Sequence, residues 1–129
     1  MTDRKKVLLV EDDEFTRFMM KEIIGTLGVD VTLAKDGKEG CDTLRDEPDV
    51  YGLVLMDLHM PGMSGIDATD HIRGLEKDPP RQVPIIAVTA DVNYHDDARV
   101  EQLGMNGYAS KPVSPGHLMR LIDRYCTAA

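Results

Sequence analysis

The sequence predicts an α/β fold, a doubly wound sheet of five parallel strands with five helices covering its two faces. Short apolar segments alternate with segments of helical spacing along all 129 residues. Several apolar segments are continuous, which is typical of parallel strands buried on both faces. No linker, repeat or low-complexity stretch interrupts the alternation. We therefore expect one domain over residues 1–129.

The first strand is predicted at Lys6–Val10, a continuous apolar run. The helix that follows carries an apolar residue at every fourth position, and Gly28 is placed to end it. The residues of this face are Phe15, Met19, Ile23 and Leu27. Val29–Ala34 alternates apolar and polar residues, which predicts a second strand near an edge of the sheet. Asp36 and Glu39 form a capping pattern for the second helix.

The centre of the chain repeats this rhythm. Tyr51–Met56 is predicted to be a buried strand. Ser64 and Asp67 repeat the capping pattern and predict the start of a third helix. Asp78–Gln82 is rich in proline and polar residues and is interpreted as a loop. Val83–Ala90 is predicted to be the third strand buried on both faces.

The last third of the chain contains two further helices and one strand. Asp91–Leu103 is predicted to be helical. Asn106–Ser110 is a short and weaker strand candidate. Ser114 and Pro115 are well suited to the N-cap and first position of a final helix. The apolar residues of that helix are Leu118, Leu121, Ile122 and Tyr125.

The composition argues against several classes of partner. Lys and Arg number 15 against 23 Asp and Glu, for a net charge of −8. Direct binding to nucleic acid is not expected, because phosphate backbones need a basic surface. No apolar stretch approaches the ~20 residues of a membrane span, and the first residues do not resemble a secretory signal. Cys41 and Cys126 lack metal-ligand spacing and are interpreted as free thiols, which favours a cytoplasmic location.

Polar residues follow four of the predicted strands. Right-handed crossovers place the carboxyl ends of all strands on one edge of the sheet, where ligands bind in such folds. If the strand order is 2-1-3-4-5, the order reverses between the first and third strands, and these two supply the acids. The residues expected at this edge are Glu11, Asp12, Asp13, Asp57, Thr89 and Lys111.

Carboxylates crowded at this edge indicate a metal site. Two carboxylates ~5 Å apart repel by roughly 3 kcal/mol at an effective dielectric constant near 20. A group of them needs raised pKa values or a cation, and a few carboxylates with room for water suit Mg²⁺. Lys111 offers a positive charge and Thr89 a hydroxyl to phosphate oxygens. Asp57 is then placed as a nucleophile for phosphoryl transfer.

Four motifs, LLVEDD, MDLHMPGMSG, AVTA and GYASKP, together resemble the receiver domain of two-component response regulators, the CheY-like fold. The resemblance covers nearly the whole chain and implies a flavodoxin-like sheet in the order 2-1-3-4-5. It implies that Asp57 is the phosphoacceptor. It also implies that Asp12, Asp57 and the backbone carbonyl of His59 bind Mg²⁺ or Mn²⁺, with Glu11 acting through water.

The resemblance implies further roles around the phosphoryl group. Thr89 and Lys111 are expected to contact it, and the Tyr108 side chain to follow Thr89 when the domain is phosphorylated. The peptide bond between Lys111 and Pro112 is expected to be cis.

Two residues are expected to control how long the phosphoryl group survives. In the resembling family, the residues two positions after the phosphoacceptor and two after the threonine flank the path of the attacking water. Here these are His59 and Asp91. We expect them to slow the loss of phosphate by restricting the approach of water.

The favoured function is a phosphorylation-controlled signalling switch rather than an enzyme. The donor is expected to be a sensor histidine kinase or a histidine phosphotransfer protein, and the downstream target stays open. A metal-dependent aspartyl phosphatase is an alternative, although His59 stands where such enzymes carry an acid. A receiver-like binding module that is not phosphorylated is another. The chain is either a stand-alone regulator or a piece of a hybrid kinase or larger regulator.

Overall fold

A computed structural model of the chain describes residues 4–126 and contains five parallel strands in the order β2-β1-β3-β4-β5. The predicted order of the sheet is therefore confirmed. The elements are β1 (Lys6–Val10), α1 (Glu14–Thr26), β2 (Val31–Ala34), α2 (Gly37–Asp46), β3 (Tyr51–Asp57), α3 (Gly65–Arg73), β4 (Ile85–Thr89), the 3₁₀ turn η1 (Val92–Tyr94), α4 (Asp97–Gln102), β5 (Gly107–Ser110) and α5 (Pro115–Tyr125).

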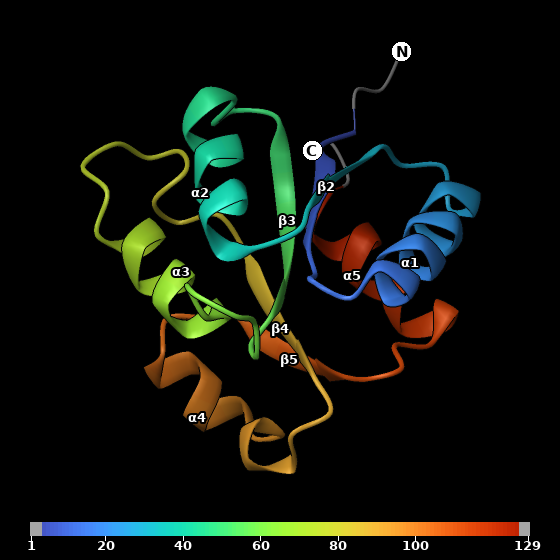
Figure 1. The fold of residues 1–129 in the computed structure, drawn as a ribbon. Helices are drawn as coiled ribbons and strands as arrows, with labels where there is room; N and C mark the ends of the chain where they lie inside the picture. Colours follow the sequence, from blue (N-terminus) through green and yellow to red (C-terminus); the bar gives the residue numbers. More distant parts are fainter. Residues whose placement is uncertain (1–3, 127–129) are drawn as a thin grey trace.

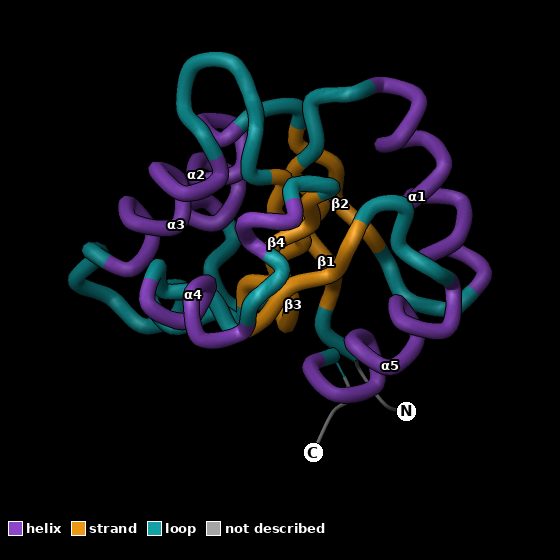
Figure 2. Tube along the Cα trace, turned by 90° about the horizontal axis from the view of Figure 1, so that it is seen from below, coloured by secondary structure: helices purple, strands orange, loops and turns teal. Residues whose placement is uncertain are grey.

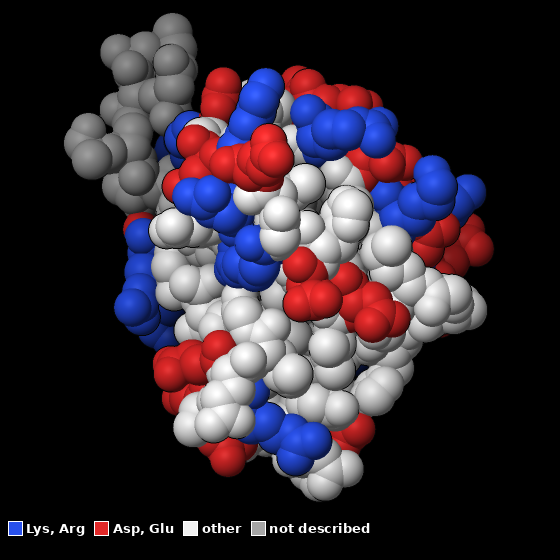
Figure 3. All heavy atoms as spheres, turned by 90° about the vertical axis from the view of Figure 1, so that its left-hand side faces the viewer, with Lys and Arg blue, Asp and Glu red and all other residues white. Residues whose placement is uncertain are grey.

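The helices form two layers around the sheet. Figure 1 shows α1 and α5 on one face and α2, α3 and α4 on the other, and Figure 2 shows the same layers from the end of the sheet at which the strands finish. Within residues 4–126, none of the helices combines the length and the hydrophobicity of a membrane span. On the face formed by α2, α3 and α4, basic and acidic side chains are intermixed (Figure 3).

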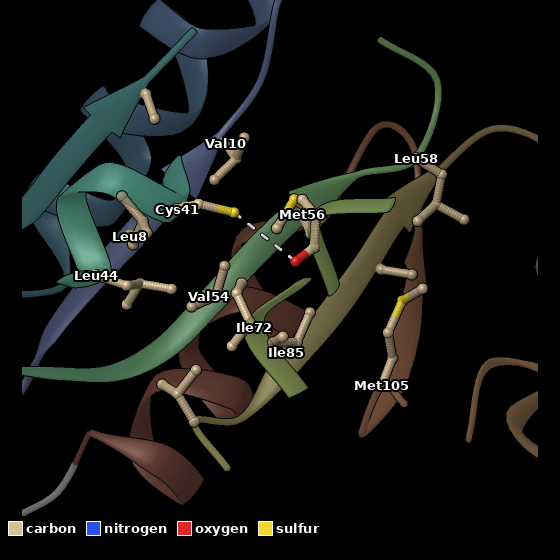
Figure 4. Packing of buried hydrophobic residues seen from close by; sticks show 14 of the residues in the cluster. Leu8, Val10, Cys41, Leu44, Val54, Met56, Leu58, Ile72, Ile85 and Met105 are labelled. Carbon is tan, nitrogen blue, oxygen red and sulfur yellow. Dashed lines mark hydrogen bonds between the residues drawn. The ribbon is translucent and has the colours of Figure 1, made fainter. Parts of the chain in front are cut away.

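The central strand β3 is buried along its whole length, as its continuous apolar sequence predicts. Val54 and Met56 point into the core beneath α2 and α3 (Figure 4), whereas Leu53 and Leu55 belong to the core beneath α1 and α5. The two cores therefore hold the strand from both sides. This burial leaves the end of β3 little freedom to move, because protein cores are closely packed.

The predicted helix caps at Asp36, Ser64 and Ser114 are confirmed. Each side chain accepts a hydrogen bond from the backbone N–H three residues later. Several strand starts differ from the prediction: β2 begins two residues after Val29 and β4 two residues after Val83. Cys41 and Cys126 are both buried and free, in opposite cores.

The predicted apolar face of α1 is partly wrong. Phe15 is 72% exposed and Met19 47% exposed, whereas Met20 and Ile24 are buried against the sheet. A residue at i+4 lies about 40° further around the helix than residue i. A row of four such residues therefore winds around the helix and cannot all face the sheet. The first two members of the row consequently face outward at the start of the helix.

The predicted helix Asp91–Leu103 is also wrong, because it is broken into η1 and α4. The Asp91 side chain accepts from the Asn93 N–H at 3.0 Å, and the Asp96 side chain accepts from the Ala98 N–H at 2.9 Å. Each aspartate thus starts its own short helix, since such side chains compete with the helical backbone for its N–H groups. Helical spacing alone did not reveal this second start.

Candidate functional site

The carboxyl ends of four strands bring the predicted polar residues to one edge of the sheet. Glu11 directly follows β1, Asp57 ends β3 and Thr89 ends β4, while Lys111 follows β5. Figure 2 looks onto this edge. The residue pairs of the parallel sheet place Asp57 beside Val88, one position before Thr89. The prediction that these residues meet at one edge is therefore confirmed by the fold.

Three acids gather beneath this edge. Glu11, Asp12 and Asp57 each offer a carboxylate oxygen, and these oxygens all lie within 4.8 Å of one another. Glu11 and Asp57 are buried, whereas Asp12 is exposed. Burial raises the pKa of Asp57 to about 7, with further contributions from Glu11 and Asp12 and an opposing one from Lys111. The cluster is thus a place where negative charge is crowded.

Lys111 is the cation of this cluster. Its Nζ lies 2.7 Å from Glu11 Oε1 and 3.4 Å from Asp57 Oδ2. Burial alone lowers the pKa of Lys111, but its contacts with Glu11 and Asp57 outweigh that effect and raise it. Among these four side chains, one ammonium faces three carboxylates. That imbalance favours binding a further cation, since one ammonium cannot neutralise all three acids.

Asp13, the last acid of the motif LLVEDD, lies outside the cluster. The Asp13 side chain caps α1 by accepting hydrogen bonds from Thr16, at 2.8 Å from its N–H and 2.7 Å from its hydroxyl. These bonds lower the pKa of Asp13, the Thr16 hydroxyl contributing most. Asp13 therefore starts the helix, and only Glu11 and Asp12 of this motif join the cluster.

The backbone around Asp57 is held closely by the start of α3. The Gly65 N–H donates to the carbonyl oxygen of Leu58 at 3.1 Å. A Cβ atom on Gly65 would lie only 2.1 Å from the carbonyl oxygen of Asp57. Only glycine permits this approach, so α3 fixes the nucleophile candidate from behind.

His59 and Asp91 bridge two loops at the rim of the site. The His59 Nε2 lies 3.0 Å from Asp91 Oδ2, joining the loop after β3 to the loop after β4. The His59 N–H also donates to Asp57 Oδ1 at 3.3 Å. The Asn93 N–H, followed by His59, lowers the pKa of Asp91 below its ordinary value. The two residues expected to flank the water path thus contact each other.

Thr89 and Tyr108 lie near each other, with His95 next to both. Thr89 is buried, and its hydroxyl accepts from the Asp91 N–H at 3.0 Å. Tyr108 is half-buried in β5, and the His95 ring stacks on it. Neither His95 nor Arg17 could be identified from the sequence; the Arg17 Nη1 donates to the Glu11 carbonyl oxygen at 2.9 Å. Both side chains contact backbone carbonyl groups, and such contacts produce no pattern of residue spacing from which they could be predicted.

An apolar groove of about 280 Å³ opens beside Lys111. It lies between α1 and the loop that leads to α5. The peptide bond between Lys111 and Pro112 is cis, as expected. The residues that line the groove are Phe15, Thr16, Met19, Met20, Ile23, Lys111, Pro112 and Val113.

Comparison with known proteins places this site in context. Residues 7–123 match the family model of the response regulator receiver domain. The chain is 35% identical over 122 residues to hybrid signal transduction histidine kinase I of Dictyostelium discoideum, covering 92% of this chain but only 7% of the kinase. It is 34% identical to the polar-differentiation response regulator DivK of Brucella anthropi, covering 94% of this chain and 95% of DivK.

Two solved structures are similar in fold. The receiver domain of sensor histidine kinase PA1611 of Pseudomonas aeruginosa, with magnesium in its active-site cleft, superposes with a TM-score of 0.81 at 34% identity, covering 94% of this chain and 96% of that one. The receiver domain of Saccharomyces cerevisiae Ssk1, in complex with the phosphotransfer protein Ypd1, gives a TM-score of 0.80 at 26% identity, covering 98% and 91%.

Proposed function

The chain belongs to the response regulator receiver family, and on that premise we propose that it is a signalling switch controlled by phosphorylation of Asp57. The observation that carries this proposal is the cluster of Glu11, Asp12 and Asp57 against the single ammonium of Lys111. Such a site attracts a divalent cation and a phosphoryl group together. Receiver domains are signalling switches, which distinguishes them from enzymes that turn over an external substrate.

Mg²⁺, or Mn²⁺ in its place, fits the acids of this site. Carboxylate oxygens are the ligands these hard cations prefer, and one exposed acid leaves room for water. Asp12 and Asp57 would hold the ion, with the backbone carbonyl of His59, and Glu11 would act through water. The bound ion would supply positive charge beside the phosphoryl oxygens and keep Asp57 ionised. That second effect matters because the pKa of Asp57 is otherwise about 7.

The proposed reaction moves a phosphoryl group from a phosphohistidine to Asp57. A carboxylate oxygen of Asp57 forms the new O–P bond while the N–P bond of the donor breaks, and the released imidazole takes up a proton. Lys111 and Thr89 are proposed to contact the transferred oxygens. The buried strand β3 and the close approach of Gly65 hold the attacking oxygen in place, so catalysis consists largely of positioning.

The donor is proposed to be a histidine kinase or histidine phosphotransfer protein. The Ssk1 receiver, a structural neighbour, forms a complex with the phosphotransfer protein Ypd1. In this chain the apolar groove includes Lys111, whose Nζ contacts the acid cluster. A partner seated on exposed Phe15 and Met19 would therefore bring its phosphohistidine next to Asp57. The downstream target is not identified by these contacts.

The proposal is tested by phosphorylation with a small donor. Incubation with acetyl phosphate and Mg²⁺ should add one phosphate to the intact mass, and chelation should prevent it. Asp57→Asn should abolish the addition, whereas the control Asp46→Asn, on the exposed surface of α2, should not. Equal labelling of Asp57→Asn and wild type would overturn the proposed function.

A further inference from the structure

His95 contacts the two residues on which switching is proposed to depend. It lies between η1 and α4, in the segment that breaks the predicted helix. Its Nε2 lies 2.9 Å from the carbonyl oxygen of Thr89. Its ring stacks on Tyr108, with ring centroids 5.1 Å apart and planes 9° from parallel. One side chain thus touches the proposed phosphoryl contact and the half-buried aromatic of β5.

The hydrogen bond identifies the donor nitrogen of the His95 ring. A carbonyl oxygen only accepts hydrogen bonds, so Nε2 must carry the proton and donate it. The same Thr89 oxygen also accepts from the Lys111 N–H at 3.1 Å. The Thr89 carbonyl therefore connects β4 both to β5 and to the His95 ring. Any displacement of Thr89 changes the geometry of the His95 hydrogen bond directly.

Tyr108 is held between the sheet and the His95 ring. Tyr108 pairs with Ala87 in the sheet. Ala87 lies two residues before Thr89, and the two side chains are on the same face of the sheet because side chains alternate along a strand. Tyr108 packs against the core beneath α2, α3 and α4 on one side and the His95 ring on another. The ring of His95 thus limits the orientations open to Tyr108.

We propose that His95 is a positioning residue that ties the orientation of the Tyr108 ring to the position of Thr89. This inference rests on the proposed function, in which phosphorylation of Asp57 draws Thr89 toward the phosphoryl group. The Thr89 carbonyl then moves relative to Nε2, the His95 ring follows it, and Tyr108 takes a new orientation. Neither the hydrogen bond nor the stacking contact is sufficient alone.

Two substitutions separate the two contacts. His95→Phe keeps a flat ring for stacking but has no donor for the Thr89 carbonyl. His95→Gln keeps an N–H donor but has no ring. His117→Gln is the matched control, because His117 lies on α5 and its side chain makes none of these contacts.

Labelling with fluorotyrosine gives four ¹⁹F resonances, since the chain has four tyrosines, and Tyr108→Phe assigns one of them.

The measurement follows the Tyr108 resonance before and after phosphorylation, with the phosphate counted by intact mass in the same sample. Wild type and His117→Gln should show the same displacement of this resonance. In both His95 variants the displacement should be at least halved, although each variant gains one phosphate. A full wild-type displacement in either variant would overturn the coupling but leave the proposed function standing. If the wild-type protein gained no phosphate in this experiment, that result would overturn the proposed function and the coupling with it.

A second measurement needs no phosphoryl group. Nitrogen chemical shifts of the His95 ring report which nitrogen carries the proton. The hydrogen bond to Thr89 requires the Nε2–H form in the unphosphorylated chain, and His117 serves as the reference without such a bond. A predominant Nδ1–H form of His95 would remove the donor and overturn the coupling on its own.

Discussion

At the carboxyl end of the sheet three carboxylates face one ammonium, whereas near the starts of β4 and β5 the guanidinium of Arg73 faces neutral oxygens. Arg73, at the end of α3, donates to the carbonyl oxygens of Gly104 and Arg81, each at 2.7 Å. It also donates to Asn106 Oδ1 at 3.2 Å, and the same oxygen accepts from the Ile85 N–H at 2.9 Å. Arg73 thereby joins α3 to the starts of β4 and β5.

The difference lies in what surrounds each charge. Burial lowers the pKa of Arg73 and the nearby Asp78 raises it, while the neutral acceptors satisfy its donors. At the other end burial raises the pKa of Asp57 to about 7, and the neighbouring carboxyl groups of Glu11 and Asp12 add to this effect. A charge satisfied by neutral groups stabilises the fold, whereas like charges held together keep a binding site ready for a cation. Four experiments test this contrast.

The largest expected effect is at Arg73. Arg73→Met leaves the half-buried carbonyl oxygens of Gly104 and Arg81 without this donor, and it should lower the free energy of unfolding by about 3 kcal/mol. Urea denaturation measures this. Arg45→Met is the control, because Arg45 is 68% exposed and its ion pairs with Asp42 and Asp46 are worth under about 0.5 kcal/mol. Comparable losses in the two variants would show that Arg73 is an ordinary surface cation.

The second effect is a pH dependence of stability in metal-free protein. The pKa of Asp57 is raised from 3.8 to about 7 by folding. Between these values the unfolded chain binds fewer protons than the folded chain, so the free energy of unfolding falls as pH rises through this window. Asp57→Asn has no carboxyl group to titrate at this position. It should therefore lack a decrease in the free energy of unfolding on the order of 2 kcal/mol across this pH window. Urea denaturation with EDTA at the two ends of the window measures it. Identical pH profiles for the two proteins would contradict a pKa of Asp57 that folding raises.

The third effect concerns the cation. Asp12→Ala should weaken Mg²⁺ binding tenfold or more, which is about 1.4 kcal/mol, as measured by titration calorimetry. Without Mg²⁺ the same substitution relieves repulsion, so it should not lower the melting temperature. Asp46→Ala, an acid on α2, is the control and should leave Mg²⁺ affinity unchanged. Undiminished affinity in Asp12→Ala would place the ion elsewhere.

The smallest effect is kinetic and concerns the bridge between His59 and Asp91. The double substitution His59→Asn, Asp91→Glu should open the water path and speed loss of phosphate from Asp57 by about threefold, less than 1 kcal/mol of barrier. First-order decay of the purified phosphoprotein in Mg²⁺ measures it. Asp97→Glu, exposed on α4, should decay like wild type. Equal or slower decay of the double variant would show that the bridge does not restrict water.

The parts that could be predicted from the sequence depend on local chemistry. Continuous apolar runs identified β1 and β3, and short polar side chains identified the caps at Ser64 and Ser114. The gathering of Asp57 and Lys111 followed from one rule, that parallel strands share their carboxyl edge. Each of these inferences requires only neighbouring residues or the handedness of crossovers.

The parts that could not be predicted depend on contacts between distant segments. Phe15 looked like a core residue because helical spacing does not say which row of α1 the sheet covers. The break before α4 depends on Asp96 capping a second helix and on His95 reaching the Thr89 carbonyl. Backbone carbonyl groups carry no residue identity, so contacts made to them leave no motif.

Near the two ends of the described chain, the backbone is joined at the amino end of the sheet. The Lys5 N–H donates to the Cys126 carbonyl oxygen at 3.0 Å, and Arg4 pairs with Asp123 at 3.2 Å. Fusion partners attached beyond these residues would leave from adjacent points, at the end of the sheet opposite to Asp57. Adjacent exit points are compatible with insertion of the domain into a longer polypeptide, and a segment that matches it occupies 7% of the Dictyostelium discoideum hybrid kinase. Such an insertion would separate its flanking segments little and leave the carboxyl edge of the sheet uncovered.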